Sequence, residues 1–463
     1  MPKIRPEQII EEPMATILEQ LAEFSCSLKL KNIPTKVVDH AKLCIMDAIE
    51  CCVSSETDNR KTGSFASVEK NADLPCSLFG TEQRAGMADA AFYNTVSGAI
   101  AYRNDVSIVG KGHPGSIVIP TALALAEGLK LDGKTMLEAV IVGYEIMIRF
   151  GSMLGHADFP YAFRPTAFVA PVGSAFVASK AMGLSVSQTV SAASLAFNCA
   201  AGFNEWADAG TGEDVIQNGN GARAGILCAL QAKNGVLGAP SVIEGKFGFN
   251  KAYHTESFVG YFTENLGETY YLTDTRFKQI PACMNVQNVA QLADRIAKKP
   301  DFNVSEVSSI LIEMTQGGKD WPNGDKKDVE TLIHATMSLP YTTAATMIAG
   351  DCDKVRFAPP YSDDLRKLIV KIEVIAKPEY TAIQRQHQVI GLSVLMNNGK
   401  KYFEESLDAR TLTDEEVVNK FTETIDGFYG KGKGERLRTL LSEIETQSDM
   451  GDVLGILGGK AYE

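Results

Sequence analysis

The sequence predicts a mostly α-helical fold, with a large all-helical domain built from both chain termini and a smaller α+β domain between them. Helical patterns run from about residue 14 to 235 and return over 414–457, whereas β-branched runs are confined to the stretch between them. A chain of 463 residues also exceeds the size of one compact core. We therefore predict a helical domain over 1–272 and 410–463 and an α+β domain over 273–409.

The amino-terminal part has apolar residues at helical spacing, as in Val37, Val38, Ala41, Ile45, Ala48 and Ile49. The stretch 166–195 is rich in Ala, Gly and Ser, which predicts thin helices that pack closely in a buried bundle. Either Ser185 or Ser187 is expected to cap the helix that follows the break at Gly183.

Three runs in the middle of the chain are rich in β-branched residues and predict strands. They are Val307–Thr315, Leu368–Ile375 and Gln388–Met396. The sequence Asn397-Asn398-Gly399 predicts a hairpin turn into a returning strand. Helical patterns at 285–298 and 341–348 lie between these strands, so this part is expected to be α+β.

Composition argues against several classes of protein. The chain is 45% hydrophobic and 22% charged, as in globular proteins, and no run approaches the roughly 18 to 20 apolar residues that cross a bilayer. A net charge of −12 argues against nucleic-acid binding. The nine cysteines are scattered, and the first residues do not resemble a signal peptide. We expect a cytoplasmic protein with reduced thiols, no membrane partner and no nucleic-acid partner.

One glycine-rich segment, Gly110-Lys111-Gly112-His113-Pro114-Gly115-Ser116, precedes an apolar helical run. Its glycines allow the backbone to approach a ligand, and a histidine at a helix N-terminus is favoured in its neutral form. The alternative is a turn histidine that only satisfies backbone groups.

Further motifs follow in a fixed order. They are Ile119 to Glu127 (IPTALALAE), Ala139 to Glu145 (AVIVGYE), Arg164-Pro165-Thr166, Glu244 to Phe249 (EGKFGF), Lys278 three residues before Pro281, and Ser338 to Tyr341 (SLPY). Together with the histidine segment they resemble the MmgE/PrpD family, which contains 2-methylcitrate dehydratase, cis-aconitate decarboxylase and iminodisuccinate epimerase. The resemblance covers nearly the whole chain.

The resemblance implies a homodimer whose active site lies between the two domains and works without metal or organic cofactor on small di- or tricarboxylic acids. It also implies proton transfer at a carbon α to a carboxylate. By match to the motifs, His113, Lys278 and Tyr341 are the expected catalytic residues. Asp105 is similar to one acid of an aspartate cluster before the histidine and is expected to contact substrate.

Five positions depart from the family pattern and are expected to contact substrate. They are Arg103, Arg164, Asp214, Gln217 and Cys283. Arginine binds carboxylates through two parallel hydrogen bonds, so Arg103 and Arg164 are candidates for two substrate carboxylates. The alternative is an internal salt bridge between Arg164 and Asp214. Cys283 is either a buried filler or a reactive thiol, and the filler is favoured.

We therefore predict a cofactor-free lyase or isomerase, with His113 and Tyr341 as acid or base and Lys278 as a carboxylate ligand. Dehydration of a 2-methylcitrate-like acid ranks first, epimerisation follows closely, and decarboxylation of cis-aconitate ranks last. The alternative from another class is a noncatalytic relative that binds a metabolite.

Overall fold

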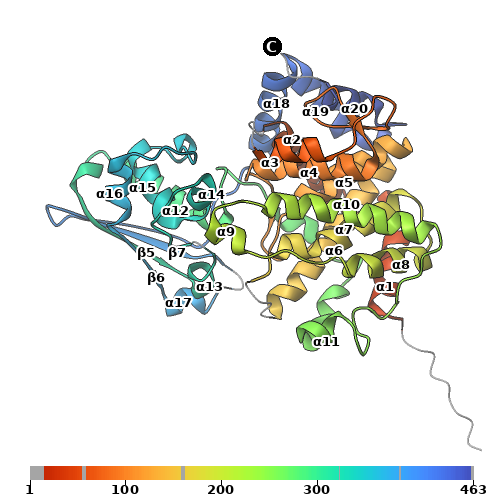
Figure 1. Ribbon diagram of the computed structural model, residues 1–463. Coiled ribbons are helices and arrows are strands. Elements are labelled where there is room, and N and C mark those ends of the chain that lie inside the picture. Colours follow the sequence, from red (N-terminus) through yellow and green to blue (C-terminus); the bar gives the residue numbers. More distant parts are fainter. Residues whose placement is uncertain (1–14, 55–58, 158–161, 323, 385–386, 460–463) are drawn as a thin grey trace, which may run out of the picture.

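The computed structural model describes residues 15–54, 59–157, 162–322, 324–384 and 387–459, and every structural statement below concerns these residues. Figure 1 shows a larger, helical lobe and a smaller lobe that contains the main sheet. Within the described ranges, no helix is both long and apolar enough to cross a membrane. Helices make up most of the regular structure and the main sheet lies in the middle of the chain, which confirms the mostly α-helical class with a β component.

The larger lobe takes its helices from both ends of the sequence. From the first part come α1 (Ile17–Ser27), α2 (Thr35–Ser54), α3 (Asn59–Ser67), α4 (Met87–Ile100), α5 (Gly115–Leu129), α6 (Gly133–His156), α7 (Pro165–Ala181), α8 (Val186–Phe197), α9 (Glu205–Ala209), α10 (Asp214–Lys233) and α11 (Phe249–Tyr253). From the last part come α18 (Asp414–Tyr429), α19 (Lys433–Ser442) and α20 (Gly451–Leu457). The expected cap at Ser185 is present, with Gln188 completing a capping box.

The smaller lobe contains a four-stranded sheet covered by helices. Its elements are α12 (Met284–Ala297), β5 (Val307–Met314), α13 (Gln316–Lys319), α14 (Leu332–Met337), α15 (Leu339–Ala349), α16 (Asp363–Ile369), β6 (Ile372–Ala376), α17 (Pro378–Thr381), β7 (Ile390–Met396) and β8 (Lys401–Ser406). The strand order is β6-β5-β7-β8, with β6 parallel to β5 and the other pairs antiparallel. The predicted hairpin joins β7 to β8, and Gly399 supplies the positive φ of its turn.

Two large hydrophobic cores lie in the described residues, beside two small clusters. The first draws on 18–277 and 417–457, and the second draws on 280–402. Helix α18 packs against α2, so the end of the chain completes the core that its beginning started. This division of the cores supports a two-domain organisation, and the boundaries 1–272, 273–409 and 410–463 stay a prediction.

Two details of the sequence prediction are wrong. The predicted strand Leu368–Ile375 begins too early, because Ser362 caps α16 and the buried face of that helix extends through Leu368 and Ile369. The larger lobe is also not all-helical, because it contains the short pair β1 (Cys76–Ser77) and β2 (Arg84–Ala85) and the strand β3 (Val106–Ser107).

Strand β3 is short but it determines where the site forms. It pairs antiparallel with β4 (Thr275–Arg276), so the loop after α4 lies beside the segment that leaves the larger lobe. A bridge between Ser107 and Gly112 closes this loop on itself. The pairing thereby brings residues 105–113 next to Lys278.

The loop is held against α6 by a close contact between two glycines. A Cβ atom added at Gly151 would lie 1.9 Å from the carbonyl oxygen of Gly110, whereas one added at Gly455 in α20 would meet no atom within 4 Å. Only glycine therefore fits at position 151 of α6.

We predict that Gly151→Ala destabilises the protein, by about 1 to 3 kcal/mol as is typical of overpacking, because either α6 or the loop must shift. Thermal or urea unfolding measures the effect. Gly455→Ala is the matched control and should cost no stability, because alanine favours a helix more than glycine does. Equal effects from both variants would contradict the argument.

Candidate active site

His113 lies two residues before α5 and is held by its backbone and its ring. Its N–H donates to the Thr166 hydroxyl at 3.2 Å, and its Nδ1 lies 2.7 Å from the carbonyl oxygen of Asp105. A carbonyl can only accept, so Nδ1 carries the hydrogen and Nε2 of the neutral ring presents a lone pair. Burial lowers the pKa of His113 well below 6.5, and the charges of Lys278 and Arg164 lower it further. The residue is therefore a neutral imidazole with its base nitrogen away from the tether.

Among the cations that lower the pKa of His113, Lys278 has the larger effect, and its side chain is almost fully buried. Burial lowers the pKa of its ammonium, while Cys283, Asp105 and Asp47 act in the opposite direction. Within the described part of the chain its hydrogen-bond acceptor is the Tyr102 carbonyl, at 3.2 Å. An ammonium has three donors, so two remain for an anionic ligand.

Asp105 is a structural anchor between these two groups. Its carboxylate accepts from the N–H of Gly115 at 3.0 Å and from the Tyr144 hydroxyl at 2.6 Å. A Cβ atom added at Gly115 would lie 2.5 Å from the Tyr144 hydroxyl and 2.7 Å from Asp105 Oδ2, which explains the glycine in the histidine segment. Burial raises the pKa of Asp105 to about 7, and nearby Asp47 adds to this effect.

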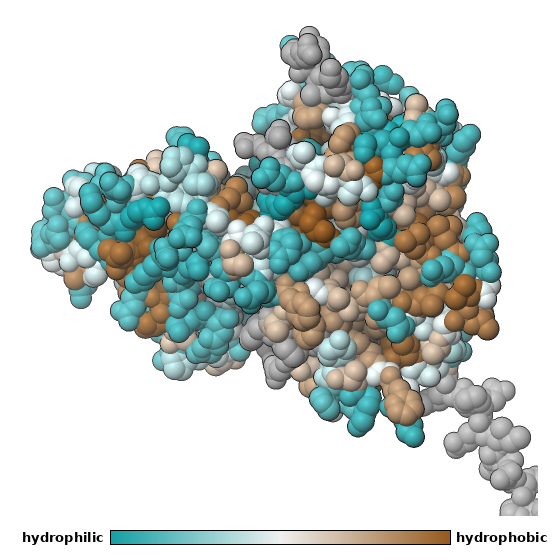
Figure 2. All heavy atoms as spheres, in the orientation of Figure 1, coloured by the Kyte–Doolittle hydropathy of each residue, from teal (hydrophilic) through white to brown (hydrophobic). Residues whose placement is uncertain are grey.

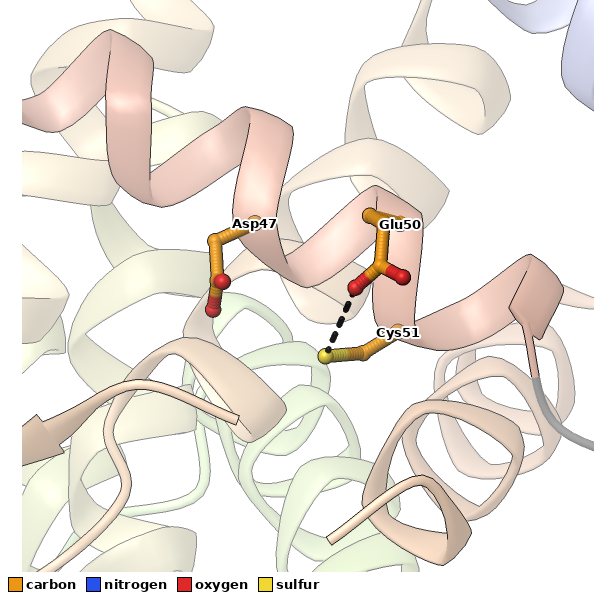
Figure 3. Close-up of side chains that lie close together, drawn as sticks. All are labelled: Asp47, Glu50 and Cys51. Atoms are coloured by element: carbon orange, nitrogen blue, oxygen red, sulfur yellow. Dashed lines mark hydrogen bonds between the residues drawn. The ribbon is translucent and has the colours of Figure 1, made fainter. Parts of the chain in front are cut away.

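A buried charge cluster lies directly behind Asp105. Asp47 and Glu50 project from the same side of α2 as Cys51 (Figure 3), and the ligand atoms of the three residues lie within 4.8 Å of one another. The ammonium of Lys420 lies 2.6 Å from Asp47 Oδ1 and 3.3 Å from Glu50 Oε2. A side-chain cation therefore lies beside both carboxylates of this group.

Two of the expected substrate ligands are engaged by the protein itself. Arg103 forms an ion pair with Glu50 of the charge cluster. The guanidinium of Arg164 lies 3.6 Å from Asp214 Oδ2 and also donates to the side chain of Asn218. The internal salt bridge between Arg164 and Asp214, raised as the alternative, is thus present. Each arginine is therefore already paired with a carboxylate of the protein in this conformation.

The remaining expected ligands lie around the same arginine or beside Lys278. Gln217 donates its amide to the carbonyl of Phe203 at 2.9 Å. Cys283 is the N-cap residue of α12 and packs against a small apolar cluster that contains Trp206 and Met337. Burial raises the pKa of its thiol, although Lys278 and Arg164 act against this rise, so the thiol is protonated at neutral pH.

Tyr341 is not brought together with His113 and Lys278. It lies in the first turn of α15 within the core of the smaller lobe, where its ring packs against Phe357 and Tyr361. Its hydroxyl donates to the carbonyl of Arg356. Burial, reinforced by Tyr361, raises its pKa. The expected role of Tyr341 in proton transfer is therefore unsupported by its contacts.

Comparison with known proteins agrees with the motifs. Residues 19–259 match the MmgE/PrpD N-terminal domain, and residues 280–446 match the MmgE/PrpD C-terminal domain. The chain belongs to the MmgE/PrpD family. Similar relatives in this family include the cis-aconitate decarboxylase-like protein oryM of Aspergillus oryzae, which is 23% identical over 97% of this chain and 98% of its own length.

Two further MmgE/PrpD relatives bear related names. The cis-aconitate decarboxylase of Homo sapiens is 28% identical over 62% of this chain and 60% of its own length. The cis-aconitate decarboxylase of Aspergillus terreus is 23% identical over 76% of this chain and 75% of its own length.

The residues of the charge cluster were not predicted from the sequence. Asp47 and Glu50 stand in an otherwise apolar helical pattern, three residues apart, and this spacing places them on one helix face. Two carboxylates on a buried face require buried cations, so the pattern was a usable signal. The partner could not be identified, because Lys420 follows 373 residues after Asp47.

We predict that Arg164→Ala lowers the unfolding free energy by about 3 to 5 kcal/mol, because it leaves the buried carboxylate of Asp214 without its ion pair. The double variant Arg164→Met/Asp214→Asn should recover part of this loss. Urea denaturation of the three proteins measures both effects. A double variant that is as unstable as the single variant would contradict the salt bridge as the cause.

We also predict that His113 makes stability depend on pH. Its folded-state pKa lies below the ordinary value of 6.5, so below pH 6.5 the unfolded chain takes up a proton that the folded protein does not. Unfolding free energy should therefore fall as the pH drops below 6.5. In His113→Gln the difference in stability between about pH 7.5 and about pH 5.5 should be smaller, as urea titrations would measure. An unchanged difference would refute the depressed pKa.

Proposed function

We propose that this protein is a cofactor-free lyase that acts on a small tricarboxylic acid, with His113 as the proton-transfer group and Lys278 as a ligand of one substrate carboxylate. The observation that carries the proposal is the tether of His113 Nδ1 to the Asp105 carbonyl, which directs the lone pair of Nε2 away from the protein backbone. The buried ammonium of Lys278 supplies the adjacent positive charge.

The names of the relatives favour decarboxylation of cis-aconitate as the first candidate reaction, although this reaction ranks last on the sequence alone. In that reaction the bond between carbon and one carboxylate breaks and carbon dioxide leaves. The electron pair stays on the carbon, which then takes up a proton. A bound polyanion beside His113 raises the pKa of the imidazole, so the imidazolium can supply that proton.

The neutral state of the free His113 favours dehydration of a 2-methylcitrate-like acid as the second candidate. Here Nε2 takes a proton from the carbon α to a carboxylate, the electron pair forms the new double bond, and hydroxide leaves with a proton as water. Epimerisation begins with the same abstraction and ends when the carbon is protonated from the other face. Both reactions need a base in the free enzyme, which a neutral imidazole provides.

Figure 2 bears on the expected homodimer. Apolar side chains gather on the surface of the larger lobe over α8 and α10, where Leu227 and, beyond the end of α10, Val236 and Leu237 are exposed. An exposed apolar face of this kind is typical of a protein–protein interface. It supports the proposal of a homodimer, which sedimentation or light scattering would test.

We predict that the protein turns over cis-aconitate or 2-methylcitrate. Proton NMR in deuterium oxide measures the reaction, and after decarboxylation deuterium should appear at the protonated carbon of the product. His113→Gln should lower kcat by about 10²- to 10⁴-fold, the usual contribution of an acid–base group. Lys278→Met should raise KM, because a carboxylate loses its cation. His387→Gln is the control, since His387 pairs with Asp408 on the smaller lobe.

Two outcomes would contradict the proposal. Full activity of the His113→Gln enzyme would exclude His113 as the proton-transfer group. Tight binding of a tricarboxylate with no turnover of any acid would favour the noncatalytic alternative.

A further inference from the structure

Two carboxylates of α2 hold the chain segment that leads to His113. Asp47 Oδ2 accepts from the backbone N–H of Asp105 at 3.1 Å, and Glu50 forms the ion pair with Arg103 two residues earlier. Asp47 and Glu50 are almost fully buried, so these contacts are shielded from water and salt. The segment 103–105 is therefore fixed at two points by one turn of one helix.

The second contribution comes from α18, near the other end of the chain. Lys420 donates to Asp47 Oδ1 at 2.6 Å, and the Thr424 hydroxyl one turn later donates to Glu50 Oε1 at 3.1 Å. Burial lowers the pKa of Lys420, but Asp47 and Glu50 outweigh this effect and raise it above its ordinary value. Lys420 is therefore charged, and it keeps Asp47 from being an uncompensated buried charge.

These contacts form a continuous chain to the proposed proton-transfer group. Lys420 holds one oxygen of Asp47, the other oxygen holds the N–H of Asp105, and the carbonyl of Asp105 holds Nδ1 of His113. The charged side chains that shift the pKa of His113 directly are those of Lys278 and Arg164. The direct hydrogen-bonded route from Asp47 to the histidine runs through the backbone of Asp105, whereas the charge of Asp47 acts on His113 only by way of Lys278.

We propose that Asp47 and Lys420 are positioning residues that fix the Asp105 peptide and thereby keep the hydrogen of His113 on Nδ1. Neither residue touches the reacting atoms. This inference rests on the proposed function in one respect: the tautomer affects turnover only if His113 is the proton-transfer group. The tautomer itself can be measured in the absence of any substrate.

The test uses two double variants that each remove one opposite-charge pair from the cluster. Asp47→Leu/Lys420→Met removes the anchor of the Asp105 N–H and leaves Glu50 paired with Arg103. Glu50→Met/Arg103→Met is the matched control, because it leaves the anchor and Lys420 in place. Both variants remove one positive and one negative charge, and only the first removes the acceptor of the Asp105 N–H.

Nitrogen-15 NMR of full-length protein with labelled histidine reports the tautomer directly. The chain has six histidines, and the signals of His113 are those that disappear in His113→Gln. In the unaltered protein and in the control variant we expect the hydrogen on Nδ1. In Asp47→Leu/Lys420→Met the preference for Nδ1 should fall by about tenfold, as loss of one oriented hydrogen bond implies.

Turnover is the second readout. Displacement of a catalytic group by about 1 Å can cost about 10²-fold in rate, so kcat of Asp47→Leu/Lys420→Met should fall by about that factor with little change in KM. A role in stability alone would lower the melting temperature without changing the tautomer or the ratio of kcat to KM.

Three results would overturn the positioning role. One is an unchanged Nδ1–H tautomer in Asp47→Leu/Lys420→Met, and another is an equal shift in the control variant, which would show that loss of the Asp47 anchor is not the cause. The third is a tautomer shift that leaves kcat unchanged in an active enzyme. Should the unaltered protein turn over no acid, a shifted tautomer still supports the anchor, and only the proposed function fails.

Folding of the first variant is not guaranteed, since it alters two buried positions. If it does not fold, Asp47→Ser/Lys420→Met takes its place, because a serine at position 47 is too short to reach the Asp105 N–H but tolerates water beside it. The same two readouts and the same expected changes apply.

Discussion

Charged groups that lose their water need partners, and this constraint fixes the path of the chain around the site. Asp47 and Glu50 of α2 are buried between the segment 103–105 and α18, and each finds a cation there. The loop that carries His113 cannot move away from α2 without separating these charges. The geometry of the proposed base is thus a consequence of charge pairing in the interior of the larger lobe.

The same constraint explains why both ends of the sequence belong to one lobe. Helix α18 packs against α2 through apolar residues such as Phe421 and Ile425, and it also carries Lys420 to the cluster. The smaller lobe is then an insertion between two parts of one core. Short strands β3 and β4 mark the place where the chain leaves that core, and Lys278 follows directly after them.

Local patterns predicted much of this structure from the sequence. Hydrophobic periodicity and turn residues located β5, β7, the hairpin at Gly399, α12 and α15, because each of these signals depends on neighbours within a few residues. The glycine-rich segment placed His113 before a helix, and the family resemblance implied that Lys278 shares a site with His113. The strand at Leu368 was wrong because apolar residues of a short buried helix and of a strand look alike over four residues.

Pairings between distant residues could not be predicted in this way. The partner of Asp47 is 373 positions away, and the salt bridge between Arg164 and Asp214 was only one of two alternatives. Tyr341 shows the opposite limit, because its motif is present but its hydroxyl bonds to the carbonyl of Arg356 in the core of the smaller lobe. A motif specifies which residue is present, whereas packing decides which way its side chain points.

The position of Lys420 near the end of the chain has a consequence for biosynthesis. While the ribosome is still producing the smaller lobe, α2 has left the exit tunnel but its two carboxylates lack the cation that α18 brings. The larger lobe can close around them only after α18 has been synthesised. A polypeptide that stops before α18 therefore leaves two interior carboxylates without the ammonium of Lys420, and the Asp105 peptide that holds His113 then rests on an uncompensated charge.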